Sequence, residues 1–239
     1  RTDPAGVTDA GSAFVIFGTD AGFPGILPIS SLNGSNGFAV NGVGLDQRLG
    51  RSVSGTGDVN GDGIDDFAIG EPNANSGAGA AHVIFGKATP FAAAINIDTL
   101  SAADGFSIAG LNGAMTSMGS SGDQFGTVVA PAGDFNNDGI DDFVIGARDA
   151  TTGLNNTQAG QAFVIFGSTN SFGPAFDLNT LNGANGFVLD GVSAGDRTGF
   201  AVNSAGDING DGIDDLALGA PEADMGAQIN DNGKVYVVF

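Results

Sequence analysis

The stretch GDVNGDGIDDFAIG at residues 57–70 decides the fold, because the chain repeats it twice more. The copies are GDFNNDGIDDFVIG at 133–146 and GDINGDGIDDLALG at 206–219. In each copy, a polar segment rich in aspartate leads into a short apolar segment. Repetition of this kind indicates one structural unit that is used several times along the chain.

Two other segments repeat in a fixed order around this stretch. GSAFVIFG at 11–18 returns at 79–86, at 160–167 and, as GKVYVVF, at 233–239; NGFAVNG at 36–42 returns at 104–110 and 185–191. Runs of Val, Ile and Phe bounded by Gly, Asn and Asp are typical of β-strands. Runs such as FVIF are apolar on both faces, which predicts strands buried between neighbours.

Each unit of about 74 residues therefore contains four predicted strands. The first precedes the aspartate-rich loop, the second follows it, the third is the VIF run and the fourth is the GFxxxG run. Tandem four-stranded units predict the blades of a β-propeller. The predicted fold is all-β, with about three blades of four antiparallel strands. We expect one partial propeller over residues 1–239: two end strands of a blade at 11–42, blade 1 at 43–110, blade 2 at 111–191, and blade 3, without its last strand, at 192–239.

The connections between the third and fourth strands carry a weaker shared pattern at 29–32, 97–100 and 178–181. We expect each of these to be a short structured segment packed against the sheet.

The composition excludes several classes of function. The chain has 27 acidic and 7 basic residues, a net charge of −20, which disfavours binding to nucleic acid or to anionic lipid. It has no cysteine, so disulfides and thiol chemistry are excluded. No apolar run is long enough to form a membrane-spanning helix. We therefore expect no nucleic-acid partner and no membrane insertion.

The aspartate-rich loops have the spacing of a calcium-binding loop. Oxygen ligands stand at positions 1, 3 and 5, glycine at position 6 permits a sharp turn, and position 7 offers a carbonyl. Position 9 adds a carboxylate. Hard oxygen ligands favour Ca²⁺ over transition metals, and Mg²⁺ prefers a stricter octahedral shell. The sequence predicts three calcium sites, with these ligand residues: Asp58, Asn60, Asp62, Ile64 and Asp66; Asp134, Asn136, Asp138, Ile140 and Asp142; Asp207, Asn209, Asp211, Ile213 and Asp215.

Two features separate these loops from other motifs. Position 12 holds Ile69, Ile145 or Leu218 instead of the glutamate of an EF-hand, so the loop joins two strands. Asp-Gly and Asn-Gly also favour hairpin turns without any metal. Three copies with the same oxygen positions favour calcium over a simple turn. The acidic residues at position 8 are expected to be solvated or to support the ligands from outside; they are Asp65, Asp141 and Asp214.

These residues resemble the FG-GAP repeat, the unit of the β-propeller in integrin α-subunits and of many bacterial surface proteins. The FG element is present as Phe125-Gly126 and the GAP element as Gly219-Ala220-Pro221, with altered forms in the other copies. The resemblance extends over residues 11–239 and implies a calcium loop between the first two strands of each blade. It also implies seven-bladed rings, whereas this chain holds about three blades. Either flanking repeats of a longer chain or self-association of copies would complete the ring.

The expected function is a non-catalytic, calcium-binding module, secreted or at the cell surface, for adhesion or protein interaction with a ligand that the sequence does not identify. Two alternatives are an accessory propeller of a larger secreted enzyme and a carbohydrate-binding propeller. No catalytic residue is predicted. The single histidine, His82, occupies a strand position where two copies carry Phe14 and Phe163, so we expect it to fill the strand. The chain has no Trp and one Tyr, which disfavours a sugar-binding face.

Overall fold

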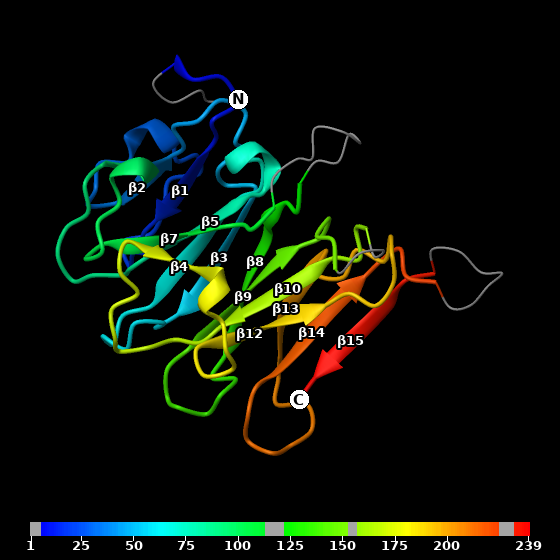
Figure 1. Ribbon diagram of the computed structural model, residues 1–239. Coiled ribbons are helices and arrows are strands. Elements are labelled where there is room, and N and C mark those ends of the chain that lie inside the picture. Colours follow the sequence, from blue (N-terminus) through cyan, green and yellow to red (C-terminus); the bar gives the residue numbers. More distant parts are fainter. Residues whose placement is uncertain (1–5, 113–121, 153–156, 225–231) are drawn as a thin grey trace.

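The computed structural model describes residues 6–112, 122–152, 157–224 and 232–239 (Figure 1). The chain is all-β, with 40% of its residues in strands and 6% in short helical turns. The strands, in chain order, are β1 (Ser12–Ile16), β2 (Gly37–Asn41), β3 (Ser52–Gly57), β4 (Asp66–Glu71), β5 (Ala80–Ile84), β6 (Ala94–Asn96), β7 (Gly105–Ala109), β8 (Phe125–Gly133), β9 (Asp142–Ala147), β10 (Gln161–Ile165), β11 (Ala175–Phe176), β12 (Gly186–Asp190), β13 (Ala201–Gly206), β14 (Asp215–Ala220) and β15 (Lys234–Val238).

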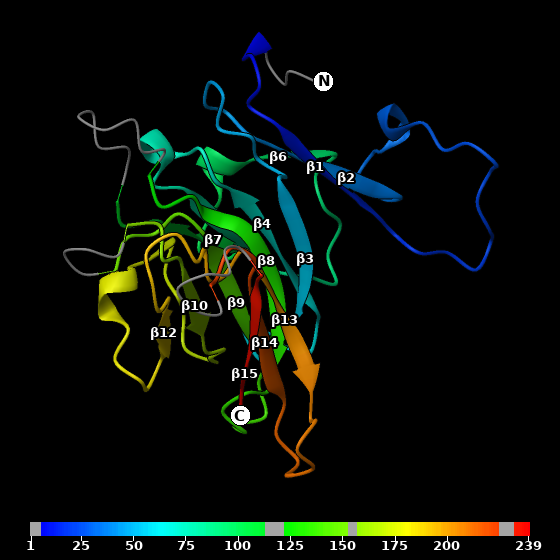
Figure 2. The same ribbon diagram turned by 90° about the vertical axis from the view of Figure 1, so that its right-hand side faces the viewer.

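The strands form successive antiparallel sheets, as the repeats predict. Blade 1 consists of β3, β4, β5 and β7, and blade 2 consists of β8, β9, β10 and β12. Blade 3 contains β13, β14 and β15, and β1 and β2 form an N-terminal half-blade. Each blade is a meander in which sequential strands pair, and successive blades lie side by side (Figures 1 and 2). This confirms the prediction of propeller-type blades.

A bulge ends the first strand of every blade. In the β3–β4 pair the register shifts between Gly55 and Gly57, and β8–β9 and β13–β14 shift at the matching point. The last glycine of the strand has φ of 75° at Gly57 and 73° at Gly133, a conformation that side chains disfavour. The repeated glycine before each aspartate-rich loop therefore turns the chain out of the sheet.

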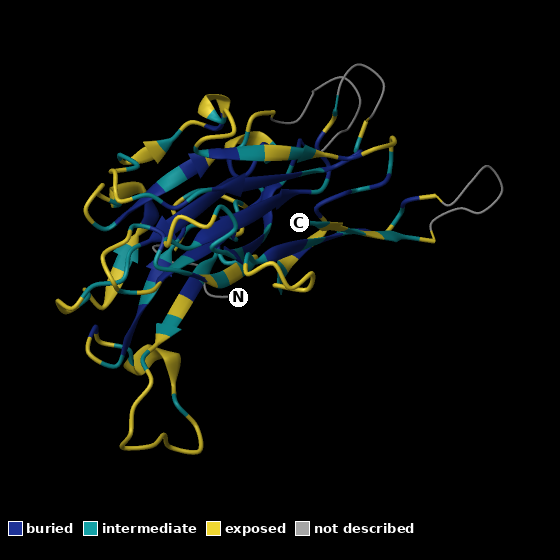
Figure 3. Cartoon of the chain, turned by 90° about the horizontal axis from the view of Figure 1, so that it is seen from below, coloured by how far each residue is buried: buried dark blue, intermediate teal, exposed yellow. Residues whose placement is uncertain are grey.

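The hydrophobic core is divided into three clusters, each shared by two neighbouring blades. The cluster between blades 1 and 2 contains Phe106 of β7 and Phe143 of β9, both fully buried. A second cluster joins blades 2 and 3, and a third joins the half-blade to blade 1. The central strands of the blades are buried and the outer segments are exposed (Figure 3). Burial of apolar surface thus occurs between blades rather than within one.

The third-to-fourth connections contain the expected structured segments and two strands that the sequence did not predict. The segments are 3-10 turns at Ile29–Ser31, Ile97–Thr99 and Leu178–Thr180. A further 3-10 turn, Asn75–Gly77, lies elsewhere, in the connection between β4 and β5. Just before two of them, β6 pairs in parallel with β2, and β11 pairs in parallel with β7. Each of these strands is therefore a further edge strand on the blade that precedes its own. They are two or three residues long, too short to show a strand pattern in sequence.

The prediction that VIF-type runs are buried on both faces is right for β5 and β10 and wrong for the runs at the two ends of the chain. In β1 and β15 buried or half-buried residues alternate with exposed ones; Ile16 is 47% exposed and Val235 is 72% exposed. Each of these strands has a packed blade on one side only. No helix among the described residues is long and apolar enough to cross a membrane.

We expect the substitution Phe172→Ala to lower the free energy of unfolding by about 2–4 kcal/mol, because it removes an aromatic side chain from the contact between blades. Phe172 stacks on Phe106 with ring centroids 4.3 Å apart. Urea denaturation measures the change. Leu45→Ala is the control, since Leu45 is 71% exposed and should shift stability by less than about 0.5 kcal/mol. Equal effects of the two substitutions would contradict this packing role.

Candidate metal centres

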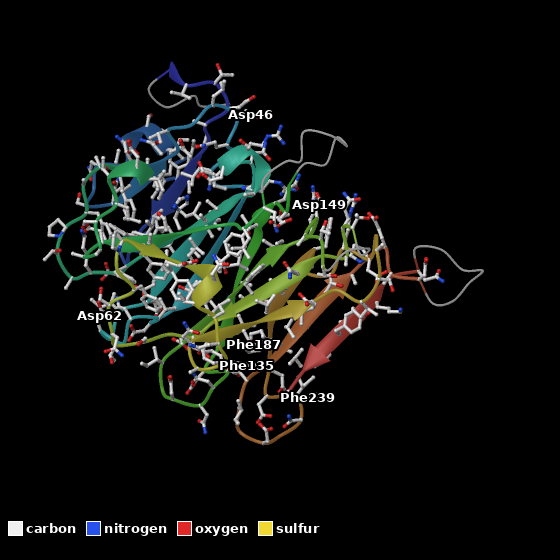
Figure 4. All side chains as sticks on the ribbon, in the orientation of Figure 1. Asp46, Asp62, Phe135, Asp149, Phe187 and Phe239 are labelled. Atoms are coloured by element: carbon white, nitrogen blue, oxygen red, sulfur yellow. The ribbon has the colours of Figure 1, made fainter. Side chains whose placement is uncertain are left out.

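The three aspartate-rich loops join the first and second strands of their blades and lie at the same end of the sheets. They connect β3 to β4, β8 to β9 and β13 to β14. Figure 4 places Asp62, in the first loop, far from Asp46 and Asp149, which lie toward the other end of the molecule. The sequence prediction that these loops sit in hairpins is confirmed.

The predicted ligand side chains of the first loop turn into the loop and accept hydrogen bonds from its backbone. The N–H of Asp62 donates to Asp58 Oδ1 at 3.0 Å and to Asn60 Oδ1 at 2.8 Å. The N–H of Gly63 donates to Asp58 Oδ2 at 2.7 Å, and the N–H of Ile64 donates to Asp62 Oδ1 at 2.9 Å. Positions 1, 3 and 5 therefore gather around one short stretch of backbone.

The other two loops repeat this arrangement donor for donor. In both, position 5 donates to positions 1 and 3, position 6 donates to position 1, and position 7 donates to position 5. Glycine at position 6 has φ of 88°, 89° and 90° in the three loops, the sharp turn that its place in the motif predicts. The N–H of Gly212 lowers the pKa of Asp207 in the third loop.

The carboxylate at position 9 has a different environment, because it is buried beneath the loop. Asp66 accepts the N–H of Val59 at 3.1 Å and that of Gly86 at 2.8 Å. Asp142 likewise accepts the N–H of Gly167 at 2.8 Å, beyond the end of β10. Burial raises the pKa of both aspartates to about 7. This residue therefore ties the start of its loop to the end of the third strand, and folding places it where its charge is costly.

The donor set of each loop suits calcium and suits few other metals. It consists of carboxylate and amide oxygens, with no histidine in the loops and no cysteine in the chain. Within the described ranges, no three or more His, Cys, Asp or Glu side chains converge closely enough to hold a metal ion as they stand. The backbone N–H groups occupy the carboxylate oxygens instead. Calcium binding at the fifteen named residues stays a prediction.

The position 8 aspartate has a role that the sequence did not predict. The side chain of Asp141, in the second loop, accepts the N–H of Asp58 in the first loop at 2.9 Å. A side chain at Gly57 would collide with this carboxylate, and one at Gly133 would collide with Asp214 of the third loop. The first and second loops thus each receive an aspartate from the following blade. Only the packing of neighbouring blades brings these residues together.

His82 fills its strand as predicted, but it also belongs to a buried polar row. Its Nε2 lies 3.0 Å from Glu71 Oε2 on β4, and its Nδ1 lies 2.9 Å from Ser107 Oγ on β7. The side chains of His82 and Glu71 are only 7% and 4% exposed. The row therefore crosslinks three strands of blade 1 beneath the surface.

Comparison with known proteins agrees with these repeats. The FG-GAP repeat matches residues 49–84, 125–165 and 200–238, each running from the start of a blade's first strand to its third. The chain is an FG-GAP repeat protein. This is the repeat of the N-terminal β-propeller of integrin α-subunits, so the predicted resemblance is confirmed.

The chain is also similar to part of an enzyme. It is 39% identical over 117 residues to phosphatidylinositol-glycan-specific phospholipase D of Rattus norvegicus, an alignment that covers 48% of this chain and 13% of the relative. The enzymes of the same name from Mus musculus and Bos taurus are 38% and 36% identical, over 46% and 44% of this chain and 12% of each relative. The chain thus spans a small fraction of the length of these relatives.

We expect His82→Phe to destabilise blade 1 by about 1–3 kcal/mol, because it leaves the buried carboxylate of Glu71 without its hydrogen-bond partner. The double variant His82→Phe with Glu71→Ala should recover most of that loss, since blade 2 carries Phe163 and Ala147 at these two positions. Urea denaturation of the two variants gives the comparison. A double variant that is no more stable than the single one would argue against the pair as the cause.

We expect the stability of the metal-free chain to fall as the pH rises from about 4 to about 7. The folded state raises the pKa of Asp66 and Asp142 from 3.8 to about 7, so it binds more protons than the unfolded state in this range. Unfolding free energies measured in chelator across the range test this. The double variant Asp66→Asn, Asp142→Asn should show a flatter dependence of the unfolding free energy on pH. An unchanged slope in that variant would mean that other groups cause the pH dependence.

Proposed function

We propose that this chain is a non-catalytic propeller module that acts outside the cell, in adhesion or protein interaction, and that Ca²⁺ stabilises the loop hairpin of each blade. The observation that carries the proposal is that all three loops have the same arrangement, in which the carboxylates at positions 1 and 5 turn into their own loop. The FG-GAP match supports the module, and the similarity to a phospholipase D is compatible with a role beside another domain.

The charge of the loops explains why a metal would matter. Twelve of the 27 acidic residues lie in the three loops, four in each. In each loop the residues that would hold Ca²⁺ are the acidic ones at positions 1, 5 and 9, the asparagine at position 3 and the isoleucine carbonyl at position 7. Bound Ca²⁺ would neutralise carboxylates that otherwise repel one another. Extracellular modules function with weak sites, with Kd on the order of 10⁻⁴–10⁻³ M.

Calcium is expected to raise the melting temperature. A ligand that binds only the folded state increases the free energy of unfolding by about 2.7 kcal/mol per site when its concentration is ~100 times its Kd. Thermal unfolding with calcium and with chelator measures the shift. The triple variant Asp62→Asn, Asp138→Asn, Asp211→Asn should lose it, since each change removes one charge from an exposed position of a loop. Asp98→Asn, an exposed aspartate outside the loops, is the matched control. No shift with calcium in the unaltered chain would refute the calcium sites.

A second candidate function is an accessory propeller of a larger secreted enzyme. It is favoured by the similarity of this chain to a limited part of phosphatidylinositol-glycan-specific phospholipase D. The surrounding gene distinguishes the two: a neighbouring hydrolase domain in the same reading frame supports the accessory role, and repeats alone support the adhesion module.

A further inference from the structure

The first and second aspartate-rich loops, residues 58–66 and 134–142, are joined to each other by a reciprocal pair of hydrogen bonds. The N–H of Asp58 donates to the carboxylate of Asp141 at 2.9 Å, and the N–H of Asp141 donates to the carbonyl of Asp58 at 3.3 Å. Asp58 stands at position 1 of its loop, and Asp141 stands between Ile140 and Asp142, at positions 7 and 9 of the next loop. A predicted ligand of one loop is therefore fixed to a residue that lies between two predicted ligands of the other.

A second connection joins the two loops through the segment that follows β10. The N–H of Gly167 donates to Asp142 Oδ1 at 2.8 Å. The N–H of the next residue, Ser168, donates to the carbonyl of Val59 in the first loop at 2.9 Å. The N–H of Val59 donates in turn to Asp66 Oδ2 at 3.1 Å. These hydrogen bonds connect the position 9 carboxylate of the second loop with that of the first.

Side chains of blade 2 also pack closely against the first loop. A side chain at Gly61 would collide with the methyl group of Thr169 and would touch Ile140 of the second loop. A side chain at Gly167 would collide with Ile140 as well. Because close-packed contacts of this kind leave little free space, a change in the shape of the second loop is transmitted to the first.

The second and third loops are related in a similar way, with the third loop at residues 207–215. A side chain at Gly133, just before the second loop, would collide with the carboxylate of Asp214. A side chain at Gly57, just before the first loop, would collide with that of Asp141. Asp141 and Asp214 both stand at position 8 of their loops. The position 8 aspartate thus reaches the start of the preceding loop at both junctions.

Calcium binding requires each loop to rearrange. The carboxylates at positions 1 and 5 accept hydrogen bonds from the backbone of their own loop. In the part of the chain that the structure describes, no three His, Cys, Asp or Glu side chains converge closely enough to hold a metal as they stand. Binding would therefore have to replace some of these hydrogen bonds. A neighbouring loop that is already ordered can lower the cost of that change.

We propose that Asp141 couples the first and second loops, so that they bind Ca²⁺ with positive cooperativity. This coupling rests on the calcium function proposed above. Asp141 acts as a positioning residue and not as a ligand. When the second loop is ordered around its ion, Ile140 and Asp142 are held on either side of Asp141, whose hydrogen bonds then hold the backbone of Asp58. The first loop loses less conformational freedom when it binds its own ion.

The charge of the loops acts in the opposite direction. A second loop that holds Ca²⁺ is less negative and attracts a further cation to the first loop less strongly. Between exposed charges this effect falls off over about 8 Å at physiological ionic strength. The partly buried hydrogen bonds of Asp141 are screened much less. We therefore expect positive coupling at physiological ionic strength and weaker coupling at low salt.

Nuclear magnetic resonance titration with Ca²⁺ measures each loop separately, through the backbone N–H groups of Gly63 and Gly139, which donate to the position 1 carboxylates. Asp138→Asn, in the second loop, should weaken binding at the first loop about fivefold, the lower end of the usual coupling between sites. Asp62→Asn should weaken binding at the second loop by the same factor, because coupling is reciprocal. The matched control is Asp211→Asn in the third loop, one blade further away, which should affect the first loop less.

Two results of this titration would count against the coupling in different ways. If Asp138→Asn leaves the affinity of the first loop unchanged or increases it, the coupling is wrong and the calcium sites stand. If no loop of the unaltered chain responds to Ca²⁺, the calcium sites are wrong and the coupling with them.

Variants of Asp141 separate positioning from charge. Asp141→Asn keeps an oxygen that can accept the N–H of Asp58, whereas Asp141→Ala keeps none. We expect the alanine variant to weaken the first loop about fivefold and its own loop less, and the asparagine variant to retain most of the affinity. Asp65→Ala, the same change at the exposed position 8 of the first loop, is the matched control and should leave the second loop unchanged. A larger effect of Asp141→Ala on its own loop would indicate local charge and overturn the positioning role.

Amide hydrogen exchange in chelator tests the contact without the metal. The N–H of Asp58 should exchange about fivefold faster in Asp141→Ala than in the unaltered chain, because it loses its hydrogen-bond acceptor. The N–H of Gly63, which donates within its own loop, should change little. Equal exchange of the Asp58 N–H in the two chains would overturn the link between the loops.

Discussion

Burial between neighbouring blades is the interaction on which the whole structure depends. A four-stranded sheet of this length has two apolar faces and cannot cover both by itself, so each blade needs a neighbour. The buried clusters of the chain each span two blades. Phe38 and Phe106 are both fully buried, and each is covered by a ring from the connection of the next blade.

The aspartate-rich loops stabilise the packing of the blades through their own hydrogen bonds, whether or not a metal is bound. Within a loop, the carboxylates at positions 1 and 5 fold the backbone of the turn around themselves. At position 9, a buried carboxylate fixes the loop to the third strand, and at position 8 Asp141 fixes it to the neighbouring blade. One short acidic segment therefore supports contacts in three directions. The concentration of charge is the cost of this arrangement: burial raises the pKa of the position 9 aspartate to about 7 in the first loop and in the second.

The individuality of the blades lies in residues that break the repeat. Blade 1 carries the buried pair of Glu71 and His82, where blade 2 carries Ala147 and Phe163. The differences at these two positions compensate each other. A buried carboxylate needs a hydrogen-bond partner, whereas a pair of apolar residues needs none. Tandem repeats can diverge in this way while keeping the same backbone.

The sequence by itself determined the blades, their strands and the position of each acidic loop, because these follow from local pattern repeated three times. Period, turn residues and runs of Val, Ile and Phe specify hairpins wherever they occur. Only the tertiary structure decided which residues join one blade to the next: the parallel strand β6, the stacking of Phe91 on Phe38, and the bond from Asp58 to Asp141. These residues lie tens of positions apart, and their repeated positions do not show which residue of one blade contacts which residue of the next. Their contacts exist because neighbouring sheets must cover each other's apolar faces, a requirement that no single repeat contains.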